Sequence, residues 1–239
     1  MPIDSLKIKE FWDIQANKAN ELRLEGVANL EENSKLLNQK VQAEYKKIMG
    51  WVDLTPNISK VLDLGSGAGQ WSFHFAKIAN KVIAVEYSRG MLNLAIQKGK
   101  IKQVSNIDFV HKSAQDYTSL DKYDLIWISG LLIYLNDDEC ETLIANCKNM
   151  LAYNGMLLLR DGTGIQSRYE IDNNYSKDLK SFYSACYRTS KEYIDLFAKY
   201  GFKLVRDENM FQEGSYLNKW KETRLRVYEF RLNNNSVKI

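Results

Sequence analysis

The chain has 239 residues with 45% hydrophobic composition, and its 33 basic and 30 acidic side chains leave a formal net charge of +3. This length is enough to bury one sizeable core, and the nearly balanced, scattered charge does not indicate a nucleic-acid partner. The N-terminal residues lack the apolar run of a signal peptide, and the longest apolar stretch, around residues 125–135, is broken by Ser129 and Gly130, so we expect a cytoplasmic protein with no membrane partner.

The first 57 residues read as mostly helical, with interruptions at residues 11–13 and 26–34. Residues 61–71 follow as Val-Leu-Asp-Leu-Gly-Ser-Gly-Ala-Gly-Gln-Trp, which predicts an apolar strand, a glycine turn and the start of a helix. Such a turn lets backbone N–H groups approach a ligand closely. A dinucleotide site needs a third glycine where Gln70 stands, and Asp63 would repel a diphosphate but attract a sulfonium. The segment therefore favours S-adenosylmethionine over a nicotinamide dinucleotide.

Residues 61–69 resemble the first motif of class I S-adenosylmethionine-dependent methyltransferases, apolar-apolar-Asp-apolar-Gly-x-Gly-x-Gly. Glu86 ends a second strand-like segment about 20 residues later, where an acid can accept hydrogen bonds from ribose hydroxyls. Residues 113–116 resemble the family's third motif, whose acid faces the adenine amino group, and residues 123–135 resemble its fourth strand and the following loop. Taken singly, each acid could instead be an exposed residue at a strand end or in a loop. The resemblance covers roughly residues 58–232.

This resemblance implies a cofactor, S-adenosylmethionine, with S-adenosylhomocysteine as the product. It also assigns the cofactor-binding residues, which are Asp63, Gly65, Ser66, Gly67, Gly69, Glu86, Tyr87, Gln115, Asp116 and Ser129. We expect no metal site, because the spacing of the three cysteines suits neither a metal nor a disulfide and favours buried small side chains.

Strand-like and helical segments alternate along the chain, which is typical of a parallel sheet covered on both faces. We expect strands at roughly 60–64, 82–86, 107–111, 123–128, 155–160, 202–205 and 225–232, and helices at roughly 69–79, 89–99, 138–151 and 188–200. The resemblance implies an α/β, Rossmann-like, seven-stranded, mostly parallel sheet with the last strand inserted antiparallel between the fifth and sixth. It further implies an N-terminal helical cap at 1–57 over the cofactor and a methyltransferase domain at 58–239.

The methyl group of a sulfonium is already activated, so such an enzyme mainly holds the acceptor in line, excludes water and, for a hydroxyl, removes a proton. Asp161 is a candidate catalytic residue because it directly follows the fifth strand, and ligands bind beyond the carboxyl ends of such strands. Tyr134, in the loop after the fourth strand, is the other candidate. The segment at about 161–189 is long for a connection, and we expect it to form a lid or an acceptor-binding insertion.

The arginines Arg160, Arg168 and Arg188, together with Tyr169, are candidate substrate residues. Arginine suits carboxylate or phosphate and tyrosine suits sugar or aromatic rings, so we expect a small polar or anionic metabolite, such as a saccharide conjugate, methylated on oxygen or nitrogen. Alternatively, these arginines pair with Glu170, Asp172 and Asp178 on the surface.

Other functions stay open at this point. No Asn-Pro-Pro-Tyr tetrapeptide follows the fourth strand, which disfavours acceptors in nucleic acid and glutamine side chains. A protein methyltransferase and a regulatory protein that binds S-adenosylmethionine without catalysis are the alternatives. A nicotinamide dehydrogenase is a further alternative, which Asp63 and Gln70 disfavour.

Overall fold

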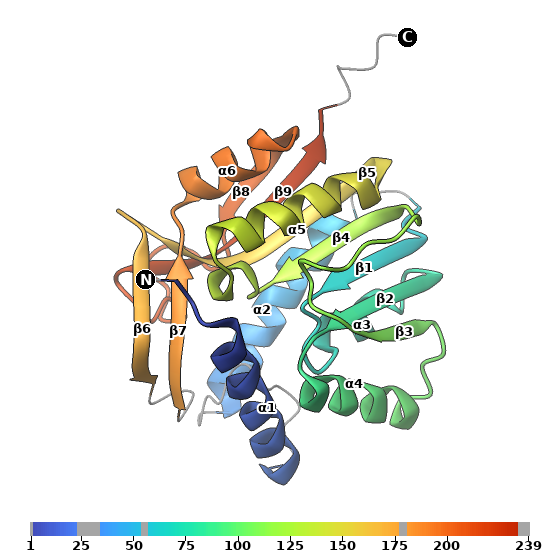
Figure 1. The fold of residues 1–239 in the computed structure, drawn as a ribbon, viewed down its shortest axis with the longest axis horizontal. Helices are drawn as coiled ribbons and strands as arrows, with labels where there is room; N and C mark the ends of the chain where they lie inside the picture. Colours follow the sequence, from blue (N-terminus) through green and yellow to red (C-terminus); the bar gives the residue numbers. More distant parts are fainter. Residues whose placement is uncertain (1, 23–33, 54–56, 177–180, 234–239) are drawn as a thin grey trace.

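A seven-stranded sheet forms the centre of the molecule, with helices on both faces (Figure 1). The computed structural model describes residues 2–22, 34–53, 57–176 and 181–233. The strands of the sheet are β1 (Lys60–Leu64), β2 (Lys81–Glu86), β3 (Ile107–His111), β4 (Tyr123–Ser129), β5 (Leu151–Gly164), β8 (Phe202–Asn209) and β9 (Thr223–Leu232). The helices are α1 (Ser5–Leu22), α2 (Ser34–Val52), α3 (Gln70–Phe75), α4 (Arg89–Ile101), α5 (Asp137–Met150) and α6 (Ser190–Lys199), with the short 3-10 helix η1 (Leu132–Tyr134).

The strand order is β3-β2-β1-β4-β5-β9-β8. β1 pairs in parallel with β2 and β4, and the parallel pairing continues to β3 and β5. β9 runs antiparallel between β5 and β8. The predicted fold class and the inserted last strand are therefore confirmed.

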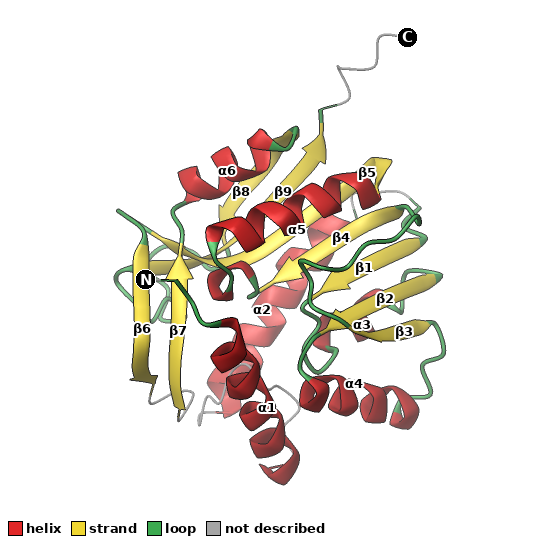
Figure 2. Cartoon of the chain, viewed as in Figure 1, coloured by secondary structure: helices red, strands yellow, loops and turns green. Residues whose placement is uncertain are grey.

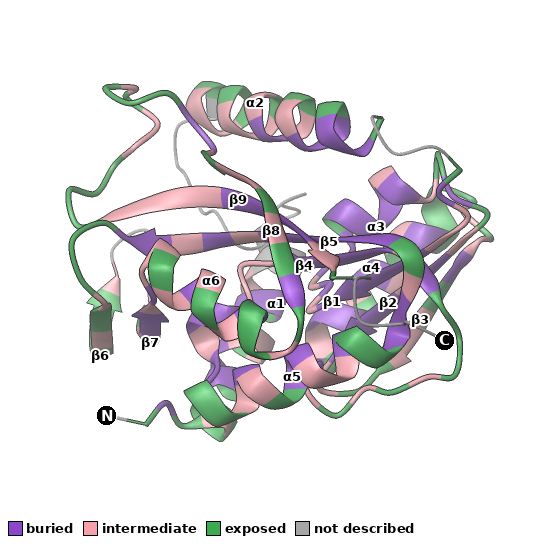
Figure 3. Cartoon of the chain, turned by 90° about the horizontal axis from the view of Figure 1, so that it is seen from above, coloured by how far each residue is buried: buried purple, intermediate pink, exposed green. Residues whose placement is uncertain are grey.

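Two apolar layers cover the two faces of the sheet, and Figure 3 shows its buried strands between helices on either side. On one face α5 and α6 pack on the sheet through Leu143, Ile144 and Phe197. On the other face α2 and α3 contribute Ile48, Trp71 and Phe75. Cys140 and Cys147 are fully buried, as predicted, in the layer of α5 and α6.

Local signals in the sequence explain where the later helices begin and end. Asn136 caps α5 in a capping box with Glu139, and Thr189 caps α6 in the same way with Glu192. Gly201 follows α6 with a φ of +85°, a conformation in which glycine is favoured. These start and stop signals confirm the sequence-based boundaries of both helices.

Two expectations about secondary structure were wrong. α1 runs unbroken through Phe11 and Trp12, because Ile8, Phe11 and Gln15 are buried at helical spacing; the second predicted interruption lies almost entirely outside the described residues. α3 ends at Phe75 rather than at about residue 79.

The segment at 161–189 contains strands that were not predicted. β5 continues to Gly164, and β6 (Tyr169–Ser176) and β7 (Ser181–Tyr187) form an antiparallel pair that stands apart from the main sheet (Figure 2).

Candidate active site

The glycine turn after β1 lies at the edge of the sheet where the parallel strands end. Gly65, Gly67 and Gly69 all have positive φ, between +55° and +80°, which other residues rarely adopt. A Cβ atom on Gly67 would meet nothing within 4 Å, so the backbone at Gly67 faces open space. A Cβ atom on Gly69 would instead lie 3.0 Å from Phe73 and 3.3 Å from Ala95, so Gly69 allows α3 to pack on α4.

Two buried carboxylates stand beside this turn. The Asp63 side chain accepts a hydrogen bond of 2.5 Å from Ser72 Oγ, and its burial raises its pKa to about 7. Glu86 accepts hydrogen bonds from the backbone N–H groups of Gly67, Tyr87 and Ser88 at 2.8, 2.9 and 2.7 Å. Burial also raises the pKa of Glu86. Glu86 thus ties the end of β2 to the glycine turn.

A cavity of about 1320 Å³ opens over these groups. Its wall is formed by the ends of β1, β2, β4 and β5, and by parts of α1, η1, β7 and other elements. Predicted site residues that line it are Asp63, Gly65, Ser66, Gly67, Glu86, Tyr87, Gln115, Ser129, Tyr134, Arg160 and Asp161. The parallel strands therefore bring residues about 100 positions apart in the sequence, such as Asp63 and Asp161, to the same cavity.

Two residues assigned to the cofactor lie outside the lining of the cavity. Gly69 packs against Phe73 as described, and Asp116 is exposed, with its carboxylate accepting a hydrogen bond from Ser113 Oγ. The neighbouring Gln115 lines the cavity and donates a long hydrogen bond of 3.4 Å to Glu139.

The arginines predicted to bind substrate are engaged in ion pairs. Arg160 lines the cavity, but its Nη2 lies 2.6 Å from the buried Glu44 Oε2. Arg168 pairs with Asp137 and Glu192 at 2.9 and 2.8 Å and lies outside the lining. These partners differ from the acids considered in the sequence, of which Asp178 is outside the described residues.

Arg188 is buried, with 2% of its surface exposed, and it supports the loop after β4. Its guanidinium donates to the carbonyl oxygens of Leu132 and Leu135 at 2.7 and 2.8 Å and to Asp137 Oδ1 at 2.6 Å. Arg188 therefore fixes the position of η1 and of Tyr134 within it. Tyr169 lies on β6 outside the cavity lining, with its ring centroid 6.0 Å from that of Tyr187.

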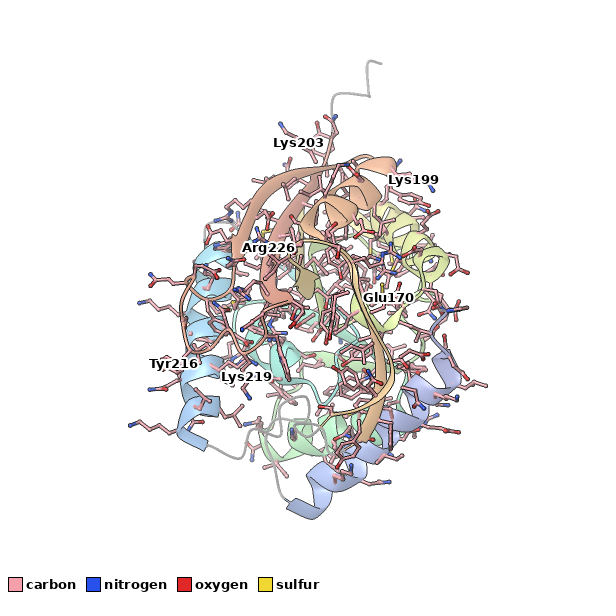
Figure 4. The ribbon with its side chains drawn as sticks, turned by 90° about the vertical axis from the view of Figure 1, so that its left-hand side faces the viewer. Glu170, Lys199, Lys203, Tyr216, Lys219 and Arg226 are labelled. Atoms are coloured by element: carbon pink, nitrogen blue, oxygen red, sulfur yellow. The ribbon has the colours of Figure 1, made fainter. Side chains whose placement is uncertain are left out.

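The structure adds aromatic residues that the sequence reading did not assign to the site. Trp12 of α1 meets Tyr134 edge to face at 5.4 Å, and both line the cavity. Tyr183 and Tyr187 reach it from β7, which descends beside α1 in Figure 4. These two tyrosines are four residues apart on one strand, so a period-two reading of residues 181–187 would have placed them on one face.

α1 is fastened across the same edge of the sheet. The Tyr87 hydroxyl donates to the Ser5 carbonyl at 2.8 Å, and Asp13 Oδ1 accepts hydrogen bonds from Ser88 Oγ at 2.5 Å and from the Gly90 N–H at 3.1 Å. The N–H of Ile3 donates to Asn136 Oδ1 at 2.7 Å. α1 therefore covers part of the opening between β2, α4 and the loop after β4.

The described residues also bear on metal binding and on membrane insertion. Within the described ranges, no group of three or more His, Cys, Asp or Glu side chains is arranged to hold a metal ion. None of the helices in those ranges is long and apolar enough to cross a membrane.

Comparison with known proteins identifies similar sequences and structures. Residues 61–155 match a family model described as a methyltransferase domain. Phosphoethanolamine N-methyltransferase 1 of Caenorhabditis elegans is 24% identical over 196 residues, which are 79% of this chain but 38% of that protein. The chain thus spans well under half the length of this relative.

Two solved structures share the fold over nearly the whole chain. A methyltransferase from Leishmania major, described as S-adenosylmethionine-dependent, superimposes with a TM-score of 0.70 at 19% identity, covering 95% of this chain and 82% of that one. Phosphoethanolamine N-methyltransferase 1 of Haemonchus contortus, in complex with phosphoethanolamine and S-adenosylhomocysteine, gives a TM-score of 0.69 at 17% identity, covering 94% of this chain and 48% of that one.

Proposed function

We propose that this chain, which has the class I methyltransferase fold, transfers a methyl group from S-adenosylmethionine to an oxygen or nitrogen atom of a small polar acceptor. The observation that carries the proposal is one cavity that joins the glycine turn, with its open side at Gly67, to the buried carboxylates of Asp63 and Glu86. The relatives named phosphoethanolamine N-methyltransferase support a small-molecule acceptor.

The residues at this end of the cavity fit the cofactor. Ser66 Oγ is buried without a hydrogen-bond partner in the described part of the chain, and it lines the cavity beside the open Gly67. Asp63 and Glu86 line the same cavity, and their carboxylates would accept hydrogen bonds from ribose hydroxyls and attract a cationic group of the cofactor. When bound, S-adenosylmethionine supplies a methyl group that is activated by its positively charged sulfur.

The rest of the chain's task is to orient the acceptor and exclude water. Trp12 of α1 and Tyr134 of η1 contact each other and line this part of the cavity. Asp161 offers a buried carboxylate that can take a proton. The sequence predicted an anionic acceptor from Arg160, Arg168 and Arg188. In the structure each of these guanidinium groups is already paired with a carboxylate of the chain.

S-adenosylhomocysteine is expected to bind and to raise the melting temperature. A ligand selective for the folded state stabilises it by about 2.7 kcal/mol at one hundred times its dissociation constant, which corresponds to roughly 5–10 °C for a chain of this size. Isothermal titration calorimetry and a thermal melt would check this result. Absence of binding at millimolar S-adenosylhomocysteine would contradict the proposed function, and tight binding of NADH instead would favour the dehydrogenase alternative.

Glu86→Gln is expected to weaken S-adenosylhomocysteine binding by about 1–3 kcal/mol. The carboxylate accepts hydrogen bonds from three backbone N–H groups, and the NH₂ group of an amide cannot replace a carboxylate oxygen as an acceptor. The glycine turn would lose its support and the ribose would lose a charged acceptor. Calorimetry should be run beside Glu10→Gln, an exposed glutamate of α1. Equal affinities for the two variants would show that Glu86 has no part in the cofactor site.

A further inference from the structure

A buried carboxylate and a group of tyrosines share one compartment of the cavity. Asp161 lies at the end of β5, Tyr134 in η1, and Tyr183 and Tyr187 on β7, and all four line the cavity. The ring of Tyr187 lies against the backbone of Gly162, where a Cβ atom would come within 2.6 Å of ring carbons. Tyr187 is therefore held directly beside the residue that follows Asp161.

These groups are close enough to influence one another. Burial raises the pKa of Tyr134, and the neighbouring Tyr183 and the negative charge of Asp161 raise it further. The pKa of Tyr187 is also raised, by burial and by the same neighbouring groups, and Tyr187 is hydrogen-bonded to Tyr183. We call Asp161, Tyr134, Tyr183 and Tyr187 the tyrosine pocket.

The charge balance of this pocket is negative. Among the described residues that α1, η1, β5 and β7 give to the cavity wall, the one cation is Arg160, and its guanidinium is paired with Glu44. Arg188 lies behind η1 and is paired with Asp137. An acceptor with a carboxylate or phosphate at this position would meet the carboxylate of Asp161 with no free cation from those described elements to offset the repulsion.

Each oxygen of the buried Asp161 carboxylate accepts one hydrogen bond. Its carboxylate accepts a hydrogen bond from the Gly162 N–H at 3.0 Å and a long one from the Tyr193 hydroxyl at 3.3 Å. Burial raises its pKa to about 7. A buried carboxylate of this kind gains most from a ligand that brings both a positive charge and N–H donors.

We propose that the acceptor is a cationic amine, bound with its ammonium group in the tyrosine pocket and methylated there on nitrogen. This inference rests on the proposed function and narrows it from oxygen or nitrogen to nitrogen. Ammonium groups bind carboxylates through charge-assisted hydrogen bonds and aromatic rings through cation–π contacts, and a carboxylate and three tyrosines line the pocket. Ile8, Trp12 and Ile133 line the adjoining wall, so the carbon skeleton of the amine would meet apolar side chains.

The chemical step balances within this arrangement. The carboxylate of Asp161 accepts one proton from the bound ammonium and becomes a neutral acid. The nitrogen lone pair then forms a bond to the methyl carbon as the carbon–sulfur bond breaks, and the electrons of that bond stay on sulfur. The products are an N-methylammonium and the neutral thioether S-adenosylhomocysteine, and Asp161 afterwards returns its proton to solvent.

Labelled S-adenosylmethionine and mixed acceptors can test the inference. The intact chain is incubated with methyl-labelled cofactor and a metabolite extract separated by ion exchange into cationic, neutral and anionic fractions, together with tyramine, benzylamine and putrescine and their hydroxyl counterparts. We expect label in N-methylated products of the cationic fraction and of the amines. Label on hydroxyl or carboxylate oxygen alone would overturn the amine inference and leave methyl transfer standing.

Binding of S-adenosylhomocysteine, measured by calorimetry in parallel, separates the two claims. No cofactor binding would contradict the proposed function itself. Intact cofactor binding with no label in any amine-containing fraction would overturn the amine inference.

Asp161→Asn keeps the shape of the side chain and removes the proton acceptor. We expect it to lower amine methylation by about 100-fold or more while cofactor affinity stays unchanged. The wild-type rate should rise with pH as Asp161 ionises near its pKa of about 7, and the variant should lose this limb. The pKa of Asp161, and so the pH at which the rate rises, depends on the ionisable groups that face it. These are Arg160, Arg188, Tyr134, Tyr187, Tyr193 and Cys140.

Asp121→Asn serves as the control, because Asp121 pairs with Lys60 at the exposed opposite end of the sheet. It should keep both the rate and the pH profile. A circular dichroism spectrum and a thermal melt would show whether each variant folds. A folded Asp161→Asn protein that methylates amines at the wild-type rate would overturn the role of Asp161.

Discussion

Replacing Gly67 with valine is expected to weaken the binding of S-adenosylhomocysteine by about 100-fold or more, the largest loss of affinity expected from a single change in this cavity. Gly67 has a φ of +55°, and a side chain there would point into open space at the glycine turn rather than into protein. Valine would therefore occupy the volume proposed for the cofactor. The strained backbone of the valine would also disturb the hydrogen bond that the N–H group of residue 67 donates to Glu86.

Gly214→Val separates these two effects. Gly214 has a φ of +77° and is exposed in the loop between β8 and β9, where an added Cβ atom would meet nothing within 4 Å. The backbone strain is comparable, but Gly214 itself does not line the cavity. Calorimetry should find wild-type affinity in Gly214→Val and no measurable binding in Gly67→Val. Equal affinities in both variants would show that the cofactor does not approach the turn at Gly67.

Arg188→Met is expected to lower the free energy of unfolding by about 2–5 kcal/mol, because the carbonyl oxygens of Leu132 and Leu135 would be left buried without their donor. Methionine retains most of the apolar stem, so the loss reports on the guanidinium. η1 carries Tyr134 between these two carbonyls, so methyl transfer should also fall. Urea unfolding followed by circular dichroism would measure the change in stability.

Arg168→Met is the matched control for this prediction. Arg168 also pairs with Asp137, but about a third of its side chain is exposed. Pairs of this kind contribute about 0–1 kcal/mol, so the variant should unfold near the wild-type midpoint. A loss of stability in Arg168→Met as large as in Arg188→Met would mean that the Asp137 ion pair, and not the buried carbonyls, carries the effect.

Most parts of the fold that the sequence predicted correctly depend on short-range rules. The turn at Gly65–Gly69 needs positive φ angles, which glycine alone adopts easily, and the capping residues Asn136 and Thr189 satisfy N–H groups within three positions of themselves. The order of the strands follows from alternation and from the family resemblance. The glycine and capping signals lie within a few residues of the features that they predict, whereas the strand order depends on motifs spread along the chain.

The parts that the sequence did not predict depend on partners far along the chain. Arg160 meets Glu44, 116 positions away, and Arg188 meets Asp137, 51 positions away, so neither pairing leaves a local signal. Both arginines looked available for an anionic acceptor for that reason. The strands β6 and β7 were not predicted, because the polar residues of 169–187 hid the alternation of a strand pair.

The placement of β9 has a consequence for how the chain is assembled during synthesis. β9 comes after every other strand in the sequence, yet it pairs with β5 from Leu157 to Gly164 and places Arg226 opposite Asp161. Until residues 223–232 have been made, β5 is an open edge whose buried leucines carry unpaired backbone groups, a ready template for contact with another chain. The strand that supplies Asp161 is therefore closed late, and a chain ending before Thr223 would be prone to aggregate rather than to form a smaller working enzyme.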